Sequence, residues 1–135
     1  MKYFSYGMNT NSTQMAHRCP DAVCLGPARL PNYQFVFHGV ADIEPAPDTW
    51  CDGVLWEISE RDLDALDVLE GYPWHYTRFS VLVETDTDAC AALVYQIVDQ
   101  SGESPPSNYY LDMILQGYEQ NGVPLDQLLE NMELS

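Results

Sequence analysis

Residues 59–73 (SERDLDALDVLEGYP) constrain the fold more than any other segment, because they carry both a start signal and a stop signal for a short helix. Ser59 is a good N-cap residue, and Asp62 three positions later completes an acidic variant of the capping box. Gly71 suits the left-handed position that follows a helix, and Pro73 prevents the helix from resuming. The sequence therefore predicts a helix that begins at Ser59 and ends at Gly71.

Glu70 occupies the last turn of this predicted helix, where its apolar stripe would continue. It follows Leu63 by seven residues and Leu66 by four, so the helical spacing points its carboxylate toward the core. A carboxylate in apolar surroundings, with Asp67 as a like charge one turn earlier, has a raised pKa and can exchange a proton near neutral pH. The alternative is a glutamate at the rim that bends out to water, and the helical pattern alone leaves both interpretations open.

The length and charge of the chain limit its possible partners. We expect one domain over residues 1–135, since chains of about 150 residues bury about 68–70% of their unfolded surface. The 21 acidic residues outnumber the 5 basic ones, and the net charge of −16 disfavours phosphate backbones and anionic membranes. We therefore predict no nucleic-acid partner, no membrane partner, and a monomer or weak homodimer. The acidic runs at 42–52, 57–70, 84–88 and 126–133 are expected to form a solvated surface, with a DNA-mimicking decoy as a rarer alternative.

The four cysteines, Cys19, Cys24, Cys51 and Cys90, have no C-x-x-C spacing and no histidine at zinc-finger spacing. They are expected to be buried free thiols in a reducing compartment, with no metal and no cofactor. The N-terminal residues lack the apolar run of a signal peptide, and no stretch approaches the about 18–20 apolar residues of a membrane span. These features predict a cytoplasmic protein.

The first predicted strand, residues 2–6 (KYFSY), runs directly into a turn over residues 7–12 (GMNTNS). Glycine and asparagine tolerate the backbone angles that turn several N–H groups toward one point, and a helix starting near Ser12 or Thr13 would add its positive end. The turn is a candidate cradle for an anion or a carbonyl oxygen, although turns of this composition most often only connect two elements.

The rest of the sequence predicts both helices and strands, with two of the strands joined in a hairpin. Helices are expected at residues 13–17, 108–121 and 124–132, strands at 33–40, 53–58, 76–84 and 89–98, and loops at 44–48 (EPAPD) and 101–107 (SGESPPS). His38 is predicted to lie on a strand with its hydrogen bonds satisfied. The two strands around residues 85–88 alternate clearly and indicate an antiparallel hairpin. About five strands in hairpin rather than βαβ order predict an α+β fold with a small mixed, mainly antiparallel, barrel-like sheet and flanking helices.

Several short motifs, in the right order, resemble those of the γ-glutamylcyclotransferase (AIG2-like) family. Residues 3–9 (YFSYGMN) are similar to the YFAYGSN loop of that family, and residues 66–71 (LDVLEG) are similar to its LDxxEG segment. Further agreement lies at Arg18-x-Pro20, at residues 28–30 (ARL) and 53–56 (GVLW), and at Pro106-Ser107-x-x-Tyr110 with Gly117 seven residues later. The resemblance covers nearly the whole chain.

The resemblance implies the fold of that family and an enzyme, of the acyltransferase or lyase type, that releases 5-oxoproline from a γ-glutamyl amine, amide or peptide. It places the catalytic glutamate at Glu70, which would act as general base on the substrate's α-amino group and then as general acid on the leaving amine. Backbone donors of Tyr6, Gly7, Met8 and Asn9 would bind the substrate carboxylate or the developing oxyanion.

Tyr95 and Tyr110 fall where the family has pocket tyrosines, and both are equally compatible with packing in the pocket wall. The chain departs from the family pattern at Met8, which replaces the usual loop serine, and at residues 72–75 (YPWH), which lie beside the presumed exit of the leaving group. These departures keep a non-catalytic module, binding a small ligand or a protein, as the alternative function. Asp67 is expected either to tune Glu70 or to solvate the helix.

Overall fold

The computed structural model describes residues 1–100 and 102–133; Ser101, the first residue of the predicted loop 101–107, and residues 134–135 lie outside this range. The elements, in chain order, are β1 (Lys2–Ser5), η1 (Met8–Thr10), α1 (Ser12–Arg18), β2 (Val23–Phe37), β3 (Ala41–Glu57), α2 (Glu60–Glu70), β4 (Tyr76–Glu84), β5 (Ala89–Ile97), α3 (Asn108–Asn121) and α4 (Asp126–Glu133).

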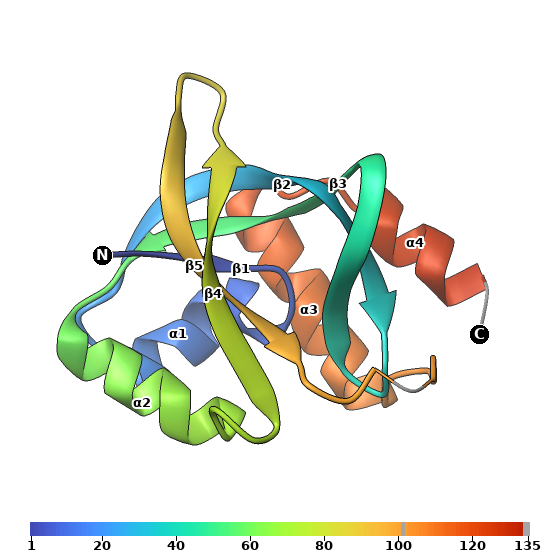
Figure 1. The fold of residues 1–135 in the computed structure, drawn as a ribbon, viewed down its shortest axis with the longest axis horizontal. Helices are drawn as coiled ribbons and strands as arrows, with labels where there is room; N and C mark the ends of the chain where they lie inside the picture. Colours follow the sequence, from blue (N-terminus) through green and yellow to red (C-terminus); the bar gives the residue numbers. More distant parts are fainter. Residues whose placement is uncertain (101, 134–135) are drawn as a thin grey trace.

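The five strands close into a barrel in the order β1-β3-β2-β4-β5 (Figure 1). Two hairpins, β2–β3 and β4–β5, supply most of the antiparallel pairing, and β1 pairs antiparallel with β3. The barrel closes where β1 runs parallel to β5, with Tyr3 opposite Leu93. This architecture confirms the predicted α+β fold with a mixed, mainly antiparallel, barrel-like sheet.

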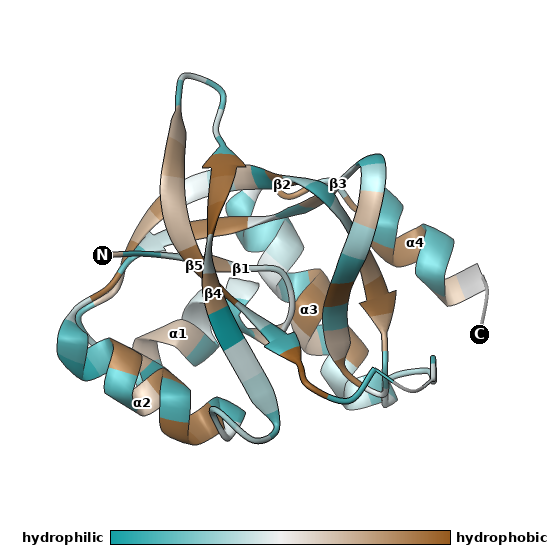
Figure 2. Ribbon diagram, in the orientation of Figure 1, coloured by the Kyte–Doolittle hydropathy of each residue, from teal (hydrophilic) through white to brown (hydrophobic). Residues whose placement is uncertain are grey.

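The core fills the barrel and the space between the barrel and its helices. Successive side chains of a strand point to opposite faces, so every strand sends apolar side chains inward. Each strand contributes at least one almost fully buried residue: Phe4, Leu30, Val54, Val83 and Val94. Figure 2 shows apolar residues concentrated along these strands and in alternating bands on α2.

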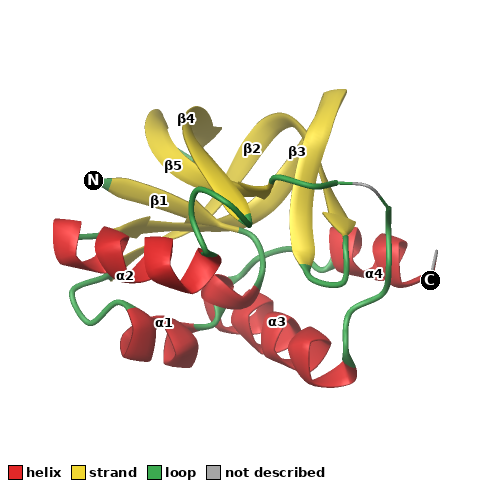
Figure 3. Cartoon of the chain, turned by 60° about the horizontal axis from the view of Figure 1, so that its bottom comes forward, coloured by secondary structure: helices red, strands yellow, loops and turns green. Residues whose placement is uncertain are grey.

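Helices α1, α2 and α3 lie together along one side of the barrel (Figure 3). Met15, Leu66 and Ile114, one from each helix, are almost fully buried and belong to the same core as the strands. Glu70, at the end of α2, lies at the same end of the barrel as the turn after β1.

The predicted boundaries of α2 are confirmed. The Ser59 hydroxyl accepts a hydrogen bond from the Asp62 amide (3.1 Å), and the Asp62 carboxylate accepts one from the Ser59 amide (3.2 Å). This reciprocal pair is the capping box that the sequence indicated. Gly71 ends the helix in the left-handed conformation, at φ 65°.

The prediction of a loop at residues 44–48 is wrong, because these residues belong to β3. Pro45 and Glu44 pair with Tyr33 and Gln34 of β2, so the two strands form one long hairpin from 23 to 57. The register shifts next to Asn32, which adopts a positive φ of 65°. Prolines are tolerated in strands at edges and bulges. The prolines of residues 44–48 are therefore compatible with a strand that continues past them.

The expectation that the acidic runs are solvated is wrong at three positions, since Asp42, Asp52 and Asp62 are buried. Each has partners that replace water. Asp42 accepts a hydrogen bond from the Ile97 amide (3.0 Å) and lies 2.8 Å from Nδ1 of His38. His38, just beyond the end of β2, is therefore satisfied as predicted, although it lies outside the strand.

All four cysteines are free thiols, but only part of the burial prediction holds. Cys19 and Cys51 are buried and Cys90 is half-buried, whereas Cys24 is exposed and contradicts the prediction. Among the described residues, no helix has the length and apolar character needed to cross a membrane.

Candidate active site

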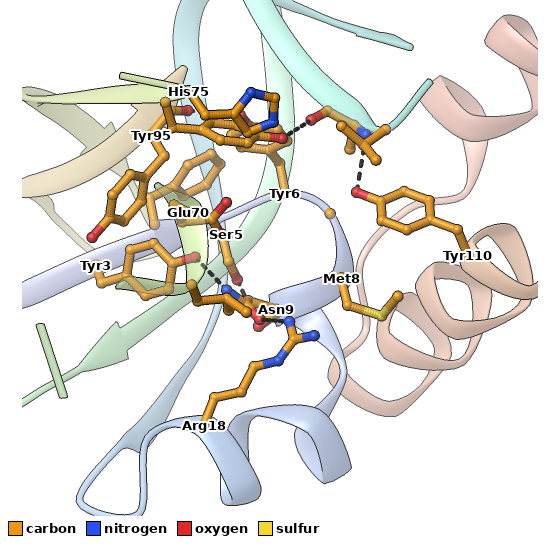
Figure 4. A pocket seen from close by; sticks show the side chains of 16 residues that line it. Tyr3, Ser5, Tyr6, Met8, Asn9, Arg18, Glu70, His75, Tyr95 and Tyr110 are labelled. Carbon is orange, nitrogen blue, oxygen red and sulfur yellow. Dashed lines mark hydrogen bonds between the residues drawn. The ribbon is translucent and has the colours of Figure 1, made fainter. Parts of the chain in front are cut away.

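Glu70, the last residue of α2, lines a cavity of about 290 Å³ at one end of the barrel (Figure 4). This volume lies at the small end of ligand pockets, which range from about 300 to 1,000 Å³. The cavity brings together all seven residues that the sequence indicated for the site: Tyr6, Gly7, Met8, Asn9, Glu70, Tyr95 and Tyr110. Residues more than 60 positions apart thus line the same cavity, because β1 and α2 end close together.

The environment of Glu70 sets its protonation near neutral pH. Burial raises the pKa of Glu70 to about 7, and the positive charge of Arg18 opposes this shift. A carboxyl group with this pKa can accept and return a proton under physiological conditions. Glu70 is half-buried and lines the cavity, which favours the inward interpretation over a rim residue bent out to water.

Asp67 does not act as the like charge that the helical spacing suggested. Its carboxylate lies 2.9 Å from Nε of Arg78, with which it forms an ion pair, and it accepts a hydrogen bond from the Tyr95 hydroxyl (2.6 Å). The raised pKa of Glu70 comes from burial instead. Asp67 therefore fastens α2 to β4 and β5, a role that neither expectation described.

Hydrogen bonds from the barrel and from α3 anchor the turn after β1. The Ser5 hydroxyl donates to the Asn9 carbonyl oxygen (3.0 Å) and accepts from Nε1 of Trp56 (2.9 Å). The Tyr118 hydroxyl donates to the Tyr6 carbonyl oxygen (2.6 Å). These bonds occupy carbonyl oxygens on the protein side and fix the conformation of the turn before any substrate arrives.

Two glycines allow the turn to lie this close to its neighbours. A Cβ atom on Gly7 would lie 2.8 Å from the Cβ of Ala41, closer than such atoms approach in proteins. A Cβ on Gly117 of α3 would lie 2.6 Å from the backbone nitrogen of Asn11. Glycine is therefore required at both positions by close approach.

Arg18 and Asn9 determine how the Tyr3 hydroxyl is used. Nη1 of Arg18 donates to Oδ1 of Asn9 (2.6 Å), and Nδ2 of Asn9 donates to the Tyr3 hydroxyl oxygen (3.0 Å). A guanidinium group has only donors, so it fixes the orientation of the Asn9 amide and makes the Tyr3 oxygen an acceptor. The proton of the Tyr3 hydroxyl has no acceptor within the described residues and is available to a ligand.

The backbone N–H and C=O of Ala41 position two more tyrosines. Its N–H donates to the Tyr110 hydroxyl oxygen (2.9 Å), and its carbonyl oxygen accepts from the Tyr76 hydroxyl (3.3 Å). Burial raises the pKa of Tyr110 to about 12, so its hydroxyl stays protonated at neutral pH. The Tyr110 hydroxyl therefore accepts from the backbone and retains its own proton for the cavity.

Tyr6 and Tyr95 contribute their rings to the wall. The Tyr6 hydroxyl donates to the carbonyl oxygen of Tyr95 (2.7 Å), and the Tyr95 hydroxyl donates to Asp67. Met8 lines the cavity with a thioether, which has no hydrogen-bond donor. The similar loop of the γ-glutamylcyclotransferase family has a serine at this place.

Sequence reasoning did not assign several residues that line the cavity, among them the polar side chains of Tyr3, Arg18, His75 and Tyr76. Tyr3 and Arg18 stand within matched motifs, which was the available signal. His75 belongs to the 72–75 segment noted beside the exit; it is exposed, and its ring meets the edge of Tyr76 with centroids 5.0 Å apart. Within the described part of the chain, no group of three or more His, Cys, Asp or Glu side chains is arranged to hold a metal ion.

Comparison with known proteins identifies the family. A family model described as "Gamma-glutamyl cyclotransferase, AIG2-like" matches residues 3–112. The chain is 30% identical over 138 residues to a gamma-glutamylcyclotransferase of Bos taurus and 28% identical over 137 residues to that of Homo sapiens, each match covering 92% of this chain and 73% of the relative. A solved structure named gamma-glutamyl cyclotransferase superposes with a TM-score of 0.88 at 25% identity, covering 98% of this chain and 86% of the other. The chain therefore belongs to the AIG2-like gamma-glutamyl cyclotransferase family.

Proposed function

We propose that the chain is a γ-glutamylcyclotransferase-type enzyme that releases 5-oxoproline from a γ-glutamyl amine, amide or peptide. The observation that carries this proposal is the position of Glu70, a half-buried glutamate that shares a small cavity with the anchored turn at residues 6–9 and whose pKa burial raises to about 7. The names of the curated relatives support the same reaction class.

In the first step, the Glu70 carboxylate accepts a proton from the α-ammonium group of the substrate. The resulting amine attacks the γ-carbonyl carbon of the same molecule, and a five-membered ring forms with a tetrahedral, negatively charged oxygen. Because the reaction is intramolecular, the site mainly has to hold the glutamyl chain in a bent conformation. The small volume of the cavity suits this task.

In the second step, Glu70 returns the proton to the leaving nitrogen. The bond between that nitrogen and the γ-carbon breaks and the carbonyl re-forms. The ring nitrogen, which still carries two protons after the attack, gives up the second one through Glu70 to the solvent, so that 5-oxoproline, a free amine and the Glu70 carboxylate result. One carboxyl group serves both steps because its pKa lies near the working pH, and general acid–base catalysis of this kind contributes about 10²–10⁴-fold in rate.

Stabilisation of the oxyanion falls to donors that are already in place. The amides of Gly7 and Asn9 lie at the start of η1, where a helix has N–H groups without partners inside the helix. The Met8 amide at the same place already interacts with the Tyr110 hydroxyl oxygen. The Tyr110 hydroxyl, which accepts from Ala41 and keeps its own proton, faces the same cavity. Such fixed donors stabilise a developing negative charge strongly, so the absence of a hydroxyl at Met8 is compatible with catalysis.

The test is release of 5-oxoproline from a panel of γ-glutamyl amines, γ-glutamyl dipeptides and glutathione, followed by mass spectrometry. Glu70→Gln should keep the fold, judged by circular dichroism, and should lose turnover by about 10²-fold or more. Glu119→Gln makes the same chemical change at an exposed position of α3 and is the matched control. Undiminished turnover in Glu70→Gln would reject the mechanism.

The alternative function is a module that binds a small amino-acid-like ligand without turnover, and Met8 in the turn is the feature that favours it. An unpaired carboxyl group in a binding pocket costs stability without serving binding, which favours the enzyme. Saturable binding of γ-glutamyl compounds with no 5-oxoproline released would decide for the module.

A further inference from the structure

Arg18 differs from the other arginines of this acidic chain. Each of the other three forms an ion pair with an aspartate: Arg29 with Asp52 (3.8 Å), Arg61 with Asp21 (2.7 Å) and Arg78 with Asp67 (2.9 Å). Arg18 has no carboxylate partner within the described residues, although acidic residues outnumber basic ones 21 to 5. The fold thus keeps one guanidinium group apart from the abundant carboxylates.

This guanidinium lines the same cavity as Glu70. Its one side-chain hydrogen bond within the described residues goes to the neutral amide oxygen of Asn9. A guanidinium group has five N–H donors in a fixed fork that matches a carboxylate, so most of its donors remain available to a ligand. Arg18 is half-buried, and its charge acts on Glu70 and Tyr3, whose pKa values it lowers against the effect of burial. A held, partly desolvated cation of this kind is suited to an anion that the protein itself does not supply.

We infer that Arg18 binds the α-carboxylate of the substrate's glutamyl group, with Asn9 holding the guanidinium and the Tyr3 hydroxyl donating a second hydrogen bond. The inference rests on the proposed function and assigns to it a recognition site. In a γ-glutamyl compound the α-carboxylate and the α-amino group share one carbon atom. A residue that binds the carboxylate must therefore lie beside the base that takes the proton from the amine.

The arrangement in Figure 4 fits this requirement, with Arg18 and Asn9 below Glu70 in that view and His75 above it. A chain of hydrogen bonds runs from Arg18 through Asn9 to the oxygen of Tyr3, whose hydroxyl proton is available to a ligand. Arginine and tyrosine together offer two kinds of donor to one carboxylate, and hydrogen bonds to charged groups are stronger than neutral ones.

The other charged group of some substrates, the carboxylate of a leaving amino acid, belongs on the opposite side. A leaving group of variable size has to reach solvent, and the exposed side chains of Leu69 and His75 mark the open side of the cavity. Arg18 is therefore assigned to the part that all γ-glutamyl substrates share. The amides of Gly7 and Asn9 are then left for the developing oxyanion.

A binding experiment tests this without requiring turnover, because the product 5-oxoproline retains the α-carboxylate. Calorimetric titration at pH 8 compares 5-oxoproline with its carboxamide, 5-oxoprolinamide. The wild type should bind the acid at least about 10-fold more tightly than the amide, as expected for lost charge-assisted hydrogen bonds. The ratio should fall to near one in Arg18→Gln and should persist in Arg61→Gln, which removes the same charge at an exposed position.

Equal binding of the acid and the amide by the wild type, no measurable binding of 5-oxoproline, or an unchanged ratio in Arg18→Gln would overturn the inference. Arg18→Lys, which keeps the charge and loses the planar fork, should give an intermediate ratio. Circular dichroism of each variant confirms that the fold is retained.

Turnover provides the second arm. At pH 8.5, Arg18→Gln should lower kcat/KM about 10- to 100-fold, and equally, for γ-glutamyl ethylamine and γ-glutamyl alanine. A loss confined to γ-glutamyl alanine would assign Arg18 to the leaving group and contradict the inference. Absence of turnover with every compound would count against the proposed function alone, since the binding ratio still decides the role of Arg18.

Discussion

Replacement of Glu70 by glutamine is expected to stabilise the fold in a pH-dependent way. Glu70 has an ordinary pKa of 4.5, which burial raises to about 7 in the folded protein. Between these two values the folded state holds a proton at this position that the unfolded state has lost. Stability therefore falls as pH rises through this window, and the loss is complete above the folded pKa.

The magnitude follows from the two pKa values. Each unit of difference corresponds to about 1.4 kcal/mol, so the change from 4.5 to about 7 corresponds to about 3 kcal/mol at pH 8. Glutamine is neutral at every pH, so it does not have this cost of ionisation in the folded state. Glu70→Gln should then exceed the wild type in free energy of unfolding by up to about 3 kcal/mol at pH 8 and should match it at pH 4.

Urea unfolding followed by circular dichroism at pH 4 and pH 8 measures both differences. Glu119→Gln controls for the change of charge at an exposed helical position. An equal gain at both pH values would show that the amide packs better for reasons unrelated to ionisation. A loss of stability at pH 8 would refute the account of Glu70 as a desolvated carboxylate.

Three further predictions concern the supports of the site. Gly117→Ala should destabilise the fold by about 1–3 kcal/mol in urea unfolding. The new Cβ would be overpacked against the backbone at the end of η1, and this cost outweighs the gain of about 1 kcal/mol in helix propensity. Unchanged stability would contradict the close approach. Asp67→Asn should cost about 2 kcal/mol in the same assay, since the acceptor for Arg78 and Tyr95 is weakened. The acidic limb of kcat/KM for 5-oxoproline release should lie near pH 7 and should move to higher pH in Arg18→Gln, because that cation favours the ionised form of Glu70.

Features encoded by neighbouring residues were predictable from the sequence. The capping box of α2 needs only Ser59 and Asp62, and its termination needs only Gly71, so local chemistry decides both ends. The β4–β5 hairpin follows from the alternation of residue types on both sides of a short turn. The same logic placed Glu70 on the inward stripe of its helix, and burial in the folded chain gave it the expected pKa.

Features that depend on distant partners were not predictable. Asp67 has the spacing of a like charge on Glu70, but Tyr95, 28 residues further along the chain, binds it instead. Asp42 sits in an acidic run that suggests a solvated surface, yet it is buried against the Ile97 amide, 55 residues away. The proline-rich composition of residues 44–48 predicts a loop, because no local rule shows that β2 continues far enough to pair with them.

The turn after β1 keeps its conformation although Met8 replaces the serine of the family's loop. The turn at residues 6–9 is held by bonds to its carbonyl oxygens and by two close glycine contacts, none of which involves the side chain of Met8. The hydroxyls of Tyr3 and Tyr110 also lie at the cavity, and their oxygens are already fixed as acceptors. Under the proposed function, the features particular to this chain at residues 72–75 would act on the leaving group, while Glu70 and Arg18 would act on the glutamyl group.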